Sequence, residues 1–333
     1  MFFKSLNIYS IAVEADIRDL DPSGLEEALI ERPARSCTGA ELSCMGWTSP
    51  LGRHGEMLTH KAGDCIMICA KREEKVIPAA VVREMLQEKV ESIEQTEGRK
   101  VRRREQQELK DELLFDLIPR AFSKSTLLYA YIDVANGFLV VDTPSSKKSE
   151  ELISLLRETI GSLPVRPLEV ANQPAGMMTD WIRTSAPIGY IVLSDAVLCD
   201  TTEEGGLIRC KKQDLESEEI SALIQTGKLA TSLAMEWQER LAFTLIDNLT
   251  IKSLKFMDLL LEEAADAGAE DAATRFDVDF TIMTRELAVF INSLVDVLGG
   301  APEQEESSVA TPGHEETDPL YRDAVSRVRA SET

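Results

Sequence analysis

The 333-residue sequence lacks the features that mark several large protein classes. No apolar run approaches the roughly 20 residues that a membrane-spanning helix needs. Residues 1–5 do not have the basic, apolar and small-residue regions of a secretory signal. The six cysteines are spread along the chain, so they do not form the dense framework of a small disulfide-stabilised domain. We therefore expect a cytoplasmic protein with reduced thiols and no membrane partner.

Motifs of common enzyme classes are also missing. There is no G-x-x-x-x-G-K-[ST] loop, no G-x-G-x-x-G fingerprint and no G-x-S-x-G elbow, which argues against an ATPase and a serine hydrolase. Asp64, Glu73 and Lys75 have the residue types of a Mg²⁺-dependent nuclease site. That spacing is permissive in a chain with 58 acidic residues. We predict a protein that is not an enzyme and keep the nuclease as an alternative.

Metal-ligand spacings are equally scarce. Cys65 and Cys69 would share one face of a strand, and His54 and His60 precede them. No C-x-x-C pair accompanies them, so small buried side chains are the favoured interpretation over a zinc site. We predict neither a metal nor a cofactor.

Positive charge is in short supply, with 36 basic against 58 acidic residues and a net charge of −22. Such a protein repels a phosphate backbone unless its cations are gathered in one place. The basic residues form two clusters: residues 99–104 hold five basic residues in six positions, and residues 209–213 form the second cluster. The alternative to DNA contact is a solvated helix face for the first cluster and a solvated strand edge for the second. The predicted phosphate-contacting residues are Arg99, Lys100, Arg102, Arg103, Arg104, Arg209, Lys211, Lys212 and Gln213.

Nothing near these clusters reads base sequence. Helix-turn-helix, zinc-finger and aromatic RNA-binding signatures are absent, and aromatic residues make up only 5% of the chain. Backbone contact by cations alone predicts binding that is independent of sequence and sensitive to salt.

Hydrophobic periodicity predicts an α+β protein with mixed, largely antiparallel sheets and flanking helices. The glycine-rich residues 46–55 predict a loop. Residues 79–118 predict a projecting helical arm, because their apolar stripe fades between 94 and 108, with Gly98 as a turn. Residues 1–300 are expected to form one DNA-binding unit. Residues 301–333, with eight acidic and three basic residues, are expected to be a disordered tail.

Eleven short segments stand out along the chain: MGW at 45–47, GRH at 52–54, LTH at 58–60, ICAKREEK at 68–75, KDE at 110–112, PRAFS at 119–123, GSLP at 161–164, KKQDL at 211–215, LKF at 254–256, RFD at 275–277 and LGG at 298–300. In this order they resemble the pattern of the recombination-associated RdgC family. The resemblance covers residues 1–300 and leaves the acidic tail outside it.

The resemblance implies a ring-shaped, head-to-head homodimer with a basic hole for DNA. It also implies non-specific binding of single- and double-stranded DNA, association with the nucleoid, and restraint of RecA-promoted strand exchange. Phe122 is similar to the family residue that fills a pocket on the partner subunit; its alternative is a local hydrophobic anchor for the arm. A protein-binding scaffold that uses its acidic exterior is a further alternative, one that would not need the arginine run.

Overall fold

The computed structural model describes residues 1–12, 22–39, 41–200, 205–266 and 271–302. Met1–Ala301 forms one compact unit, and Pro302–Thr333 counts as a second. The predicted disordered tail therefore lies outside the described residues, except for its first two positions. The described part contains eight α-helices and two sheets, and every pairing between named strands in it is antiparallel. The α+β class is confirmed, and the expected mixture of parallel and antiparallel pairs is corrected.

The first sheet is organised around two long strands. Strands β4 (Cys65–Val76) and β5 (Phe122–Asp133) pair along their whole length, from Cys65↔Asp133 to Val76↔Phe122. The strand order is β2-β4-β5-β6-β1-β7, with β3 also paired to β4. The remaining strands are β1 (Asn7–Ile11), β2 (Ser43–Thr48), β3 (Thr59–Ala62), β6 (Phe138–Val141) and β7 (Val165–Pro167).

Residues 65–70 of β4 are all buried, so both faces of the sheet are covered there, because alternate residues of a strand point to opposite sides. Met67 belongs to a core shared with the second sheet, whereas Ile66 and Ile68 belong to a separate core. The separate core is covered by α1 (Pro22–Ile30) and α4 (Ser146–Ile160), which bury their leucines in it. The Ser145 side chain caps α4 by accepting from Lys148 N–H, so this helix begins where a capping residue favours it.

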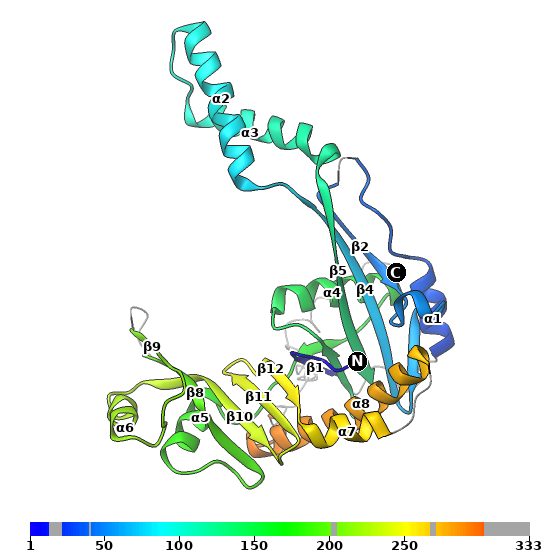
Figure 1. The fold of residues 1–333 in the computed structure, drawn as a ribbon, viewed down its shortest axis with the longest axis vertical. Coiled ribbons are helices and arrows are strands. Elements are labelled where there is room, and N and C mark those ends of the chain that lie inside the picture. Colours follow the sequence, from blue (N-terminus) through cyan, green and yellow to red (C-terminus); the bar gives the residue numbers. More distant parts are fainter. Residues whose placement is uncertain (13–21, 40, 201–204, 267–270, 303–333) are drawn as a thin grey trace, which may run out of the picture. The chain divides into compact units, whose positions relative to one another are not determined.

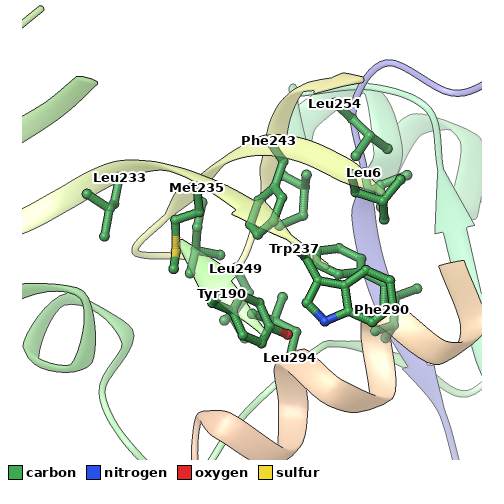
Figure 2. Packing of buried hydrophobic residues seen from close by; sticks show 14 of the residues in the cluster. Leu6, Tyr190, Leu233, Met235, Trp237, Phe243, Leu249, Leu254, Phe290 and Leu294 are labelled. Atoms are coloured by element: carbon green, nitrogen blue, oxygen red, sulfur yellow. The ribbon is translucent and has the colours of Figure 1, made fainter. Parts of the chain in front are cut away.

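The second sheet has five strands in the order β12-β11-β10-β8-β9. Its core face packs on α5 (Pro174–Arg183) and the long α8 (Ala272–Val297), and Figure 2 shows Trp237, Phe243 and Phe290 meeting there. Each large apolar side chain fully buried in this way contributes about 1.5–3 kcal/mol. The strands are β8 (Tyr190–Cys199), β9 (Leu207–Cys210), β10 (Leu229–Trp237), β11 (Leu241–Ile246) and β12 (Ile251–Phe256); the other helices are α6 (Glu218–Gln225) and α7 (Asp258–Asp266).

A helical hairpin is inserted between β4 and β5. Helices α2 (Ala79–Glu97) and α3 (Arg103–Leu117) extend beyond the Val76 and Phe122 ends of these strands (Figure 1). Gly98 ends α2 with a φ of 63°, in the left-handed region that favours glycine, and its N–H donates to the Glu94 carbonyl. The predicted arm and its turn at Gly98 are confirmed. No helix in the described ranges is long and apolar enough to cross a bilayer.

One local expectation was wrong. Residues 46–48, assigned to a glycine-rich loop, lie in β2 and pair with β4. Gly46 is needed there because a Cβ would lie 2.5 Å from the Pro33 carbonyl oxygen, in the segment that crosses the outer edge of β2. The glycine marks a close approach of two backbones rather than a turn.

Candidate nucleic-acid interface

The first cation cluster lies at the turn between α2 and α3. Arg99 and Lys100 follow Gly98 in the turn, Arg102 is the N-cap of α3, and Arg103 and Arg104 form its first two residues. All five side chains are exposed. Val101 is the exception within the run. Its side chain is buried and its N–H donates to Glu94 Oε1 at 3.0 Å, which fixes the turn.

Two of the five arm cations are compensated by carboxylates. Arg99 binds Glu105 through both terminal nitrogens at 2.7 Å and Glu97 through Nε at 2.6 Å. The hydrogen bonds that Arg99 donates to Glu105 and Glu97 raise its pKa, and the same Arg99 contact lowers the pKa of Glu105. Arg104 pairs with Glu108 at 3.2 Å while remaining 93% exposed, so that pair is weak.

Lys100, Arg102 and Arg103 form no ion pair with another described residue. The charge of Arg102 still reaches Glu105, because it adds to the Arg99 contact in lowering the pKa of that carboxyl. The cluster therefore presents three cations without an ion pair, in place of the five that the sequence run suggested.

The start of α3 is unfavourable for helix stability. The N-terminal end of a helix carries a partial positive charge, so acidic residues stabilise it and cations destabilise it. Here Arg102 occupies the N-cap without a side-chain capping bond, and Arg103 and Arg104 follow it. Glu105, the third residue of the helix, places a carboxylate in the first turn and accepts the Arg102 N–H, so three cations face one carboxylate there. A sequence selected only for a stable arm would place Ser, Asp or Glu at these positions. The arrangement is easier to understand if the cations serve a negatively charged ligand.

The second predicted cluster lies at the end of an edge strand. Strand β9 ends at Cys210, so only Arg209 of the cluster lies within it, and Lys211 and Lys212 follow the strand. Lys212 has a φ of 51°, and its N–H donates to Asp195 Oδ1 at 2.8 Å. The Gln213 N–H donates to the Ser194 carbonyl at 3.0 Å. These two bonds hold the segment against β8 and leave all four side chains exposed.

The first cluster lies in the helical hairpin between β4 and β5, and the second lies at the edge of the five-stranded sheet. No hydrogen bond or ion pair between described residues joins them. A cavity of about 380 Å³ adjoins the second cluster between α5, β8 and residues 213–216, with Gln213 on its wall.

Phe122 is the first residue of β5, directly after the short 3₁₀ turn Ile118–Arg120. It is 87% exposed and stands opposite Val76, itself 44% exposed. A side chain this exposed anchors nothing within its own chain. The local-anchor interpretation is therefore ruled out for the isolated chain.

The residues of the nuclease alternative do not form a site. Asp64 lies in the turn before β4, whereas Glu73 and Lys75 lie near the far end of that strand. Nine residues of extended strand separate Asp64 from Glu73 by about 30 Å, so they cannot share a metal ion. Glu73 is buried and accepts from the Cys37 N–H, and Lys75 donates to the Ala121 carbonyl.

The described residues do not contain the ligand cluster that the zinc alternative requires. No group of three or more His, Cys, Asp or Glu side chains in the described ranges is arranged to hold a metal ion. Cys65 and Cys69 share a face of β4 and are both buried; burial raises the pKa of each thiol to about 12. His60 instead contacts Asp277 at 3.1 Å.

The sequence reasoning missed two lysines, the half-buried Lys252 and the exposed Lys255. Lys252 and Lys255 of β12 are three residues apart, a spacing that puts residues on opposite faces of a regular strand. A bulge around Ser253, whose φ is 51°, brings both to the same face. Only the strand pairing reveals this, so no sequence signal would have found it.

Comparison with known proteins places the chain in a family. A family model described as "Putative exonuclease, RdgC" matches residues 1–301. The chain belongs to the RdgC family. The Recombination-associated protein RdgC of Tolumonas auensis is 43% identical over 301 residues, which cover 90% of this chain and 99% of that protein. The proteins of the same name from Pseudomonas aeruginosa (strain LESB58) and Yersinia pestis (strain Pestoides F) are 43% and 41% identical, each covering 90% of this chain and 98% of the relative.

These names agree on recombination and differ on catalysis. The three relatives are named for an association with recombination, whereas the description of the family model names an exonuclease. The matched residues end at 301, so the acidic C-terminal segment lies outside the family match.

Proposed function

We propose that this protein binds single- and double-stranded DNA without sequence specificity and is not an enzyme. The observation that carries the proposal is the cluster of exposed cations Lys100, Arg102 and Arg103, none of which forms an ion pair with a described residue, in a chain of net charge −22. Three cations against one carboxylate at the start of α3 oppose the helix dipole, and a phosphate backbone would add negative charge there. Arg209, Lys211, Lys212 and Gln213 would provide further contacts.

The proposed active form is a head-to-head homodimer closed into a ring, with the cations on its inside. A ring reconciles a strongly acidic protein with an anionic ligand, because the acidic exterior would keep DNA away from every surface except the basic opening. Phe122 would close one interface. An 87% exposed phenylalanine is costly to leave in water, and its burial by a partner would recover that free energy.

In the cell, the proposed role is to limit RecA-promoted strand exchange by occupying DNA in the nucleoid. Support comes from the relatives, which are named recombination-associated proteins. Occupancy needs no catalytic group, and the separation of Asp64 from Glu73 leaves the nuclease alternative without a metal site. The scaffold alternative gives no reason for unpaired arginines at a helix start.

The test is fluorescence anisotropy with the full chain and three labelled DNAs: two 30-bp duplexes of unrelated sequence and one single strand. Affinity should be equal for the two duplexes and should fall steeply with salt, with no cleavage when Mg²⁺ or Mn²⁺ is added. Divalent-metal-dependent cleavage would support the nuclease. The absence of binding at 50 mM salt would overturn the proposal and leave the scaffold.

A further inference from the structure

The five-stranded sheet has one face that no described element covers with a hydrophobic core. In β11 the odd-numbered residues Leu241, Phe243 and Leu245 enter the core against α8, so the even-numbered residues point the other way. Ala242 and Thr244 are on this second face. Their partners in neighbouring strands must share it, because residues directly opposite in an antiparallel pair point to the same side.

Strand pairing places three cations on this open face. Lys255 pairs with Ala242 and Lys252 pairs with Thr244, so the bulge of β12 puts both lysines there. At the other edge, Arg209 of β9 pairs with Val197 of β8, and Val197 pairs with Ser232 of β10. Arg209 therefore lies on the same open face as Ser232. Lys211 follows one residue after β9. The cations thus lie along both edge strands, β12 and β9.

Two carboxylates belong to the same face. Asp195 of β8 accepts a hydrogen bond from the Lys212 N–H, which partly offsets the negative charge of the Asp195 carboxylate. Glu236 of β10 pairs with Ala242 and lies in the same cross-strand row as Lys255, two strands away. No ion pair between described residues involves Arg209, Lys211, Lys252 or Lys255. The face is therefore positive in a protein that is strongly negative as a whole.

We infer that the open face of the five-stranded sheet is a phosphate-backbone platform for DNA, with Lys252 and Lys255 as contacts along one edge and Arg209 and Lys211 along the other. The inference rests on the proposed DNA binding and adds a surface to it. It explains why the second cluster sits at a sheet edge, since the cluster forms half of a two-sided arrangement.

The dimensions of the sheet suit this ligand. Four strand spacings of about 4.8 Å separate β9 from β12, about 19 Å in all. The major groove of B-DNA is about 12 Å wide, so cations that lean inward from the two edges can contact phosphates on opposite sides of one groove. On this face β10 and β11 present the short side chains of Ser232, Ala234, Ala242 and Thr244, together with Glu236, and β8 adds Val197 and Ile191. Lysine suits such contacts, because it acts as a mobile point charge without a required geometry.

The experiment compares Lys252→Gln/Lys255→Gln with Lys147→Gln/Lys148→Gln in the full chain. The control pair lies on α4, carries the same change in charge and is exposed, whereas Lys252 is half-buried and Lys255 is exposed. Binding to a 30-bp duplex is measured from 50 to 200 mM salt. Loss of two phosphate contacts should reduce the slope of log affinity against log salt concentration by about 1.8. The factor by which salt lowers the affinity over this range should therefore be about 12 times smaller for the test variant than for the parent. The control should keep the parental slope.

A second measurement needs no variant. Acetylation of lysines by an N-hydroxysuccinimide ester, followed by mass spectrometry, should show Lys252 and Lys255 protected by the duplex and Lys147 and Lys148 unprotected. If the parent binds DNA but both variants keep its slope and the duplex protects neither Lys252 nor Lys255, the platform is refuted while the proposed function stands. If the parent does not bind DNA at all, the proposed function itself fails.

Discussion

Replacement of Phe122 by serine should separate subunits without unfolding them. The side chain is 87% exposed in the single chain, so its removal should change the free energy of unfolding of a subunit by no more than about 0.5 kcal/mol. In the proposed dimer it is buried. Burial of a phenylalanine side chain contributes about 1.5–3 kcal/mol, and a two-fold interface contains the residue twice. The loss of about 3–6 kcal/mol should raise the dissociation constant of the dimer by roughly 10²- to 10⁴-fold.

Sedimentation velocity over a range of protein concentrations measures this constant. Phe122→Leu keeps an apolar side chain and should retain most of the dimer. Met57→Ser removes another exposed apolar side chain, one that is 59% exposed, and should leave the association unchanged. A Phe122→Ser protein that dimerises as tightly as the parent would remove Phe122 from the interface. A parent that sediments as a monomer at all concentrations would contradict the homodimer.

Three further predictions concern stability and reactivity. Arg240 holds the almost fully buried Glu286 through two hydrogen bonds of 2.5 and 2.7 Å, so Arg240→Met should destabilise the fold by about 3–5 kcal/mol in urea unfolding; Arg240→Met/Glu286→Leu should recover most of the loss. Burial raises the pKa of Asp142 above 3.8, and a raised carboxyl pKa means that its ionised form opposes folding. Asp142→Asn, which still accepts from the backbone, should therefore be more stable than the parent at pH 7, with a difference that vanishes as pH falls through that pKa. Cys65 and Cys69, buried and with pKa values of about 12, should resist iodoacetamide at pH 8 until the protein is unfolded in urea.

Local sequence signals were sufficient for much of the fold. The Asn136-Gly137 pair is a local hairpin signal between β5 and β6, and Gly137 has the positive φ that such a turn requires. Ser145 is a capping residue at the start of α4, and the apolar residues of α8 recur at helical spacing. These elements are determined by neighbours in the sequence, so their signals are visible without a structure.

Elements that depend on distant partners were not predictable in this way. Strand β8 alternates poorly because bulges interrupt its pairing with β10, and β12 carries a bulge of its own. Gly46 marked a close backbone contact with residues far from it in the chain, and it was taken for a loop residue.

The candidate site shows the same division. The basic run at 99–104 was visible in the sequence and is exposed, but its pairing with acidic residues was not. Arg99 meets Glu105 only because the left-handed Gly98 folds the chain back onto α3. The nuclease alternative depended on the assumption that residues near in sequence are near in space, and an extended strand separates them. Residue types suggested the chemistry, and only the fold decided which side chains are available for it.

The most direct test of the central claim is the salt dependence of DNA binding by Lys100→Gln/Arg102→Gln/Arg103→Gln. Three lost phosphate contacts should reduce the slope of log affinity against log salt concentration by about 2.7. Between 50 and 200 mM salt, the factor by which affinity falls should therefore be about 40 times smaller for this variant than for the parent, and the difference should be the same on unrelated duplexes. Lys147→Gln/Lys148→Gln/Arg166→Gln, with the same change in charge at exposed positions outside the arm, should follow the parent. Identical slopes for the arm variant and the parent would contradict the claim that the free cations of the α2–α3 turn hold DNA.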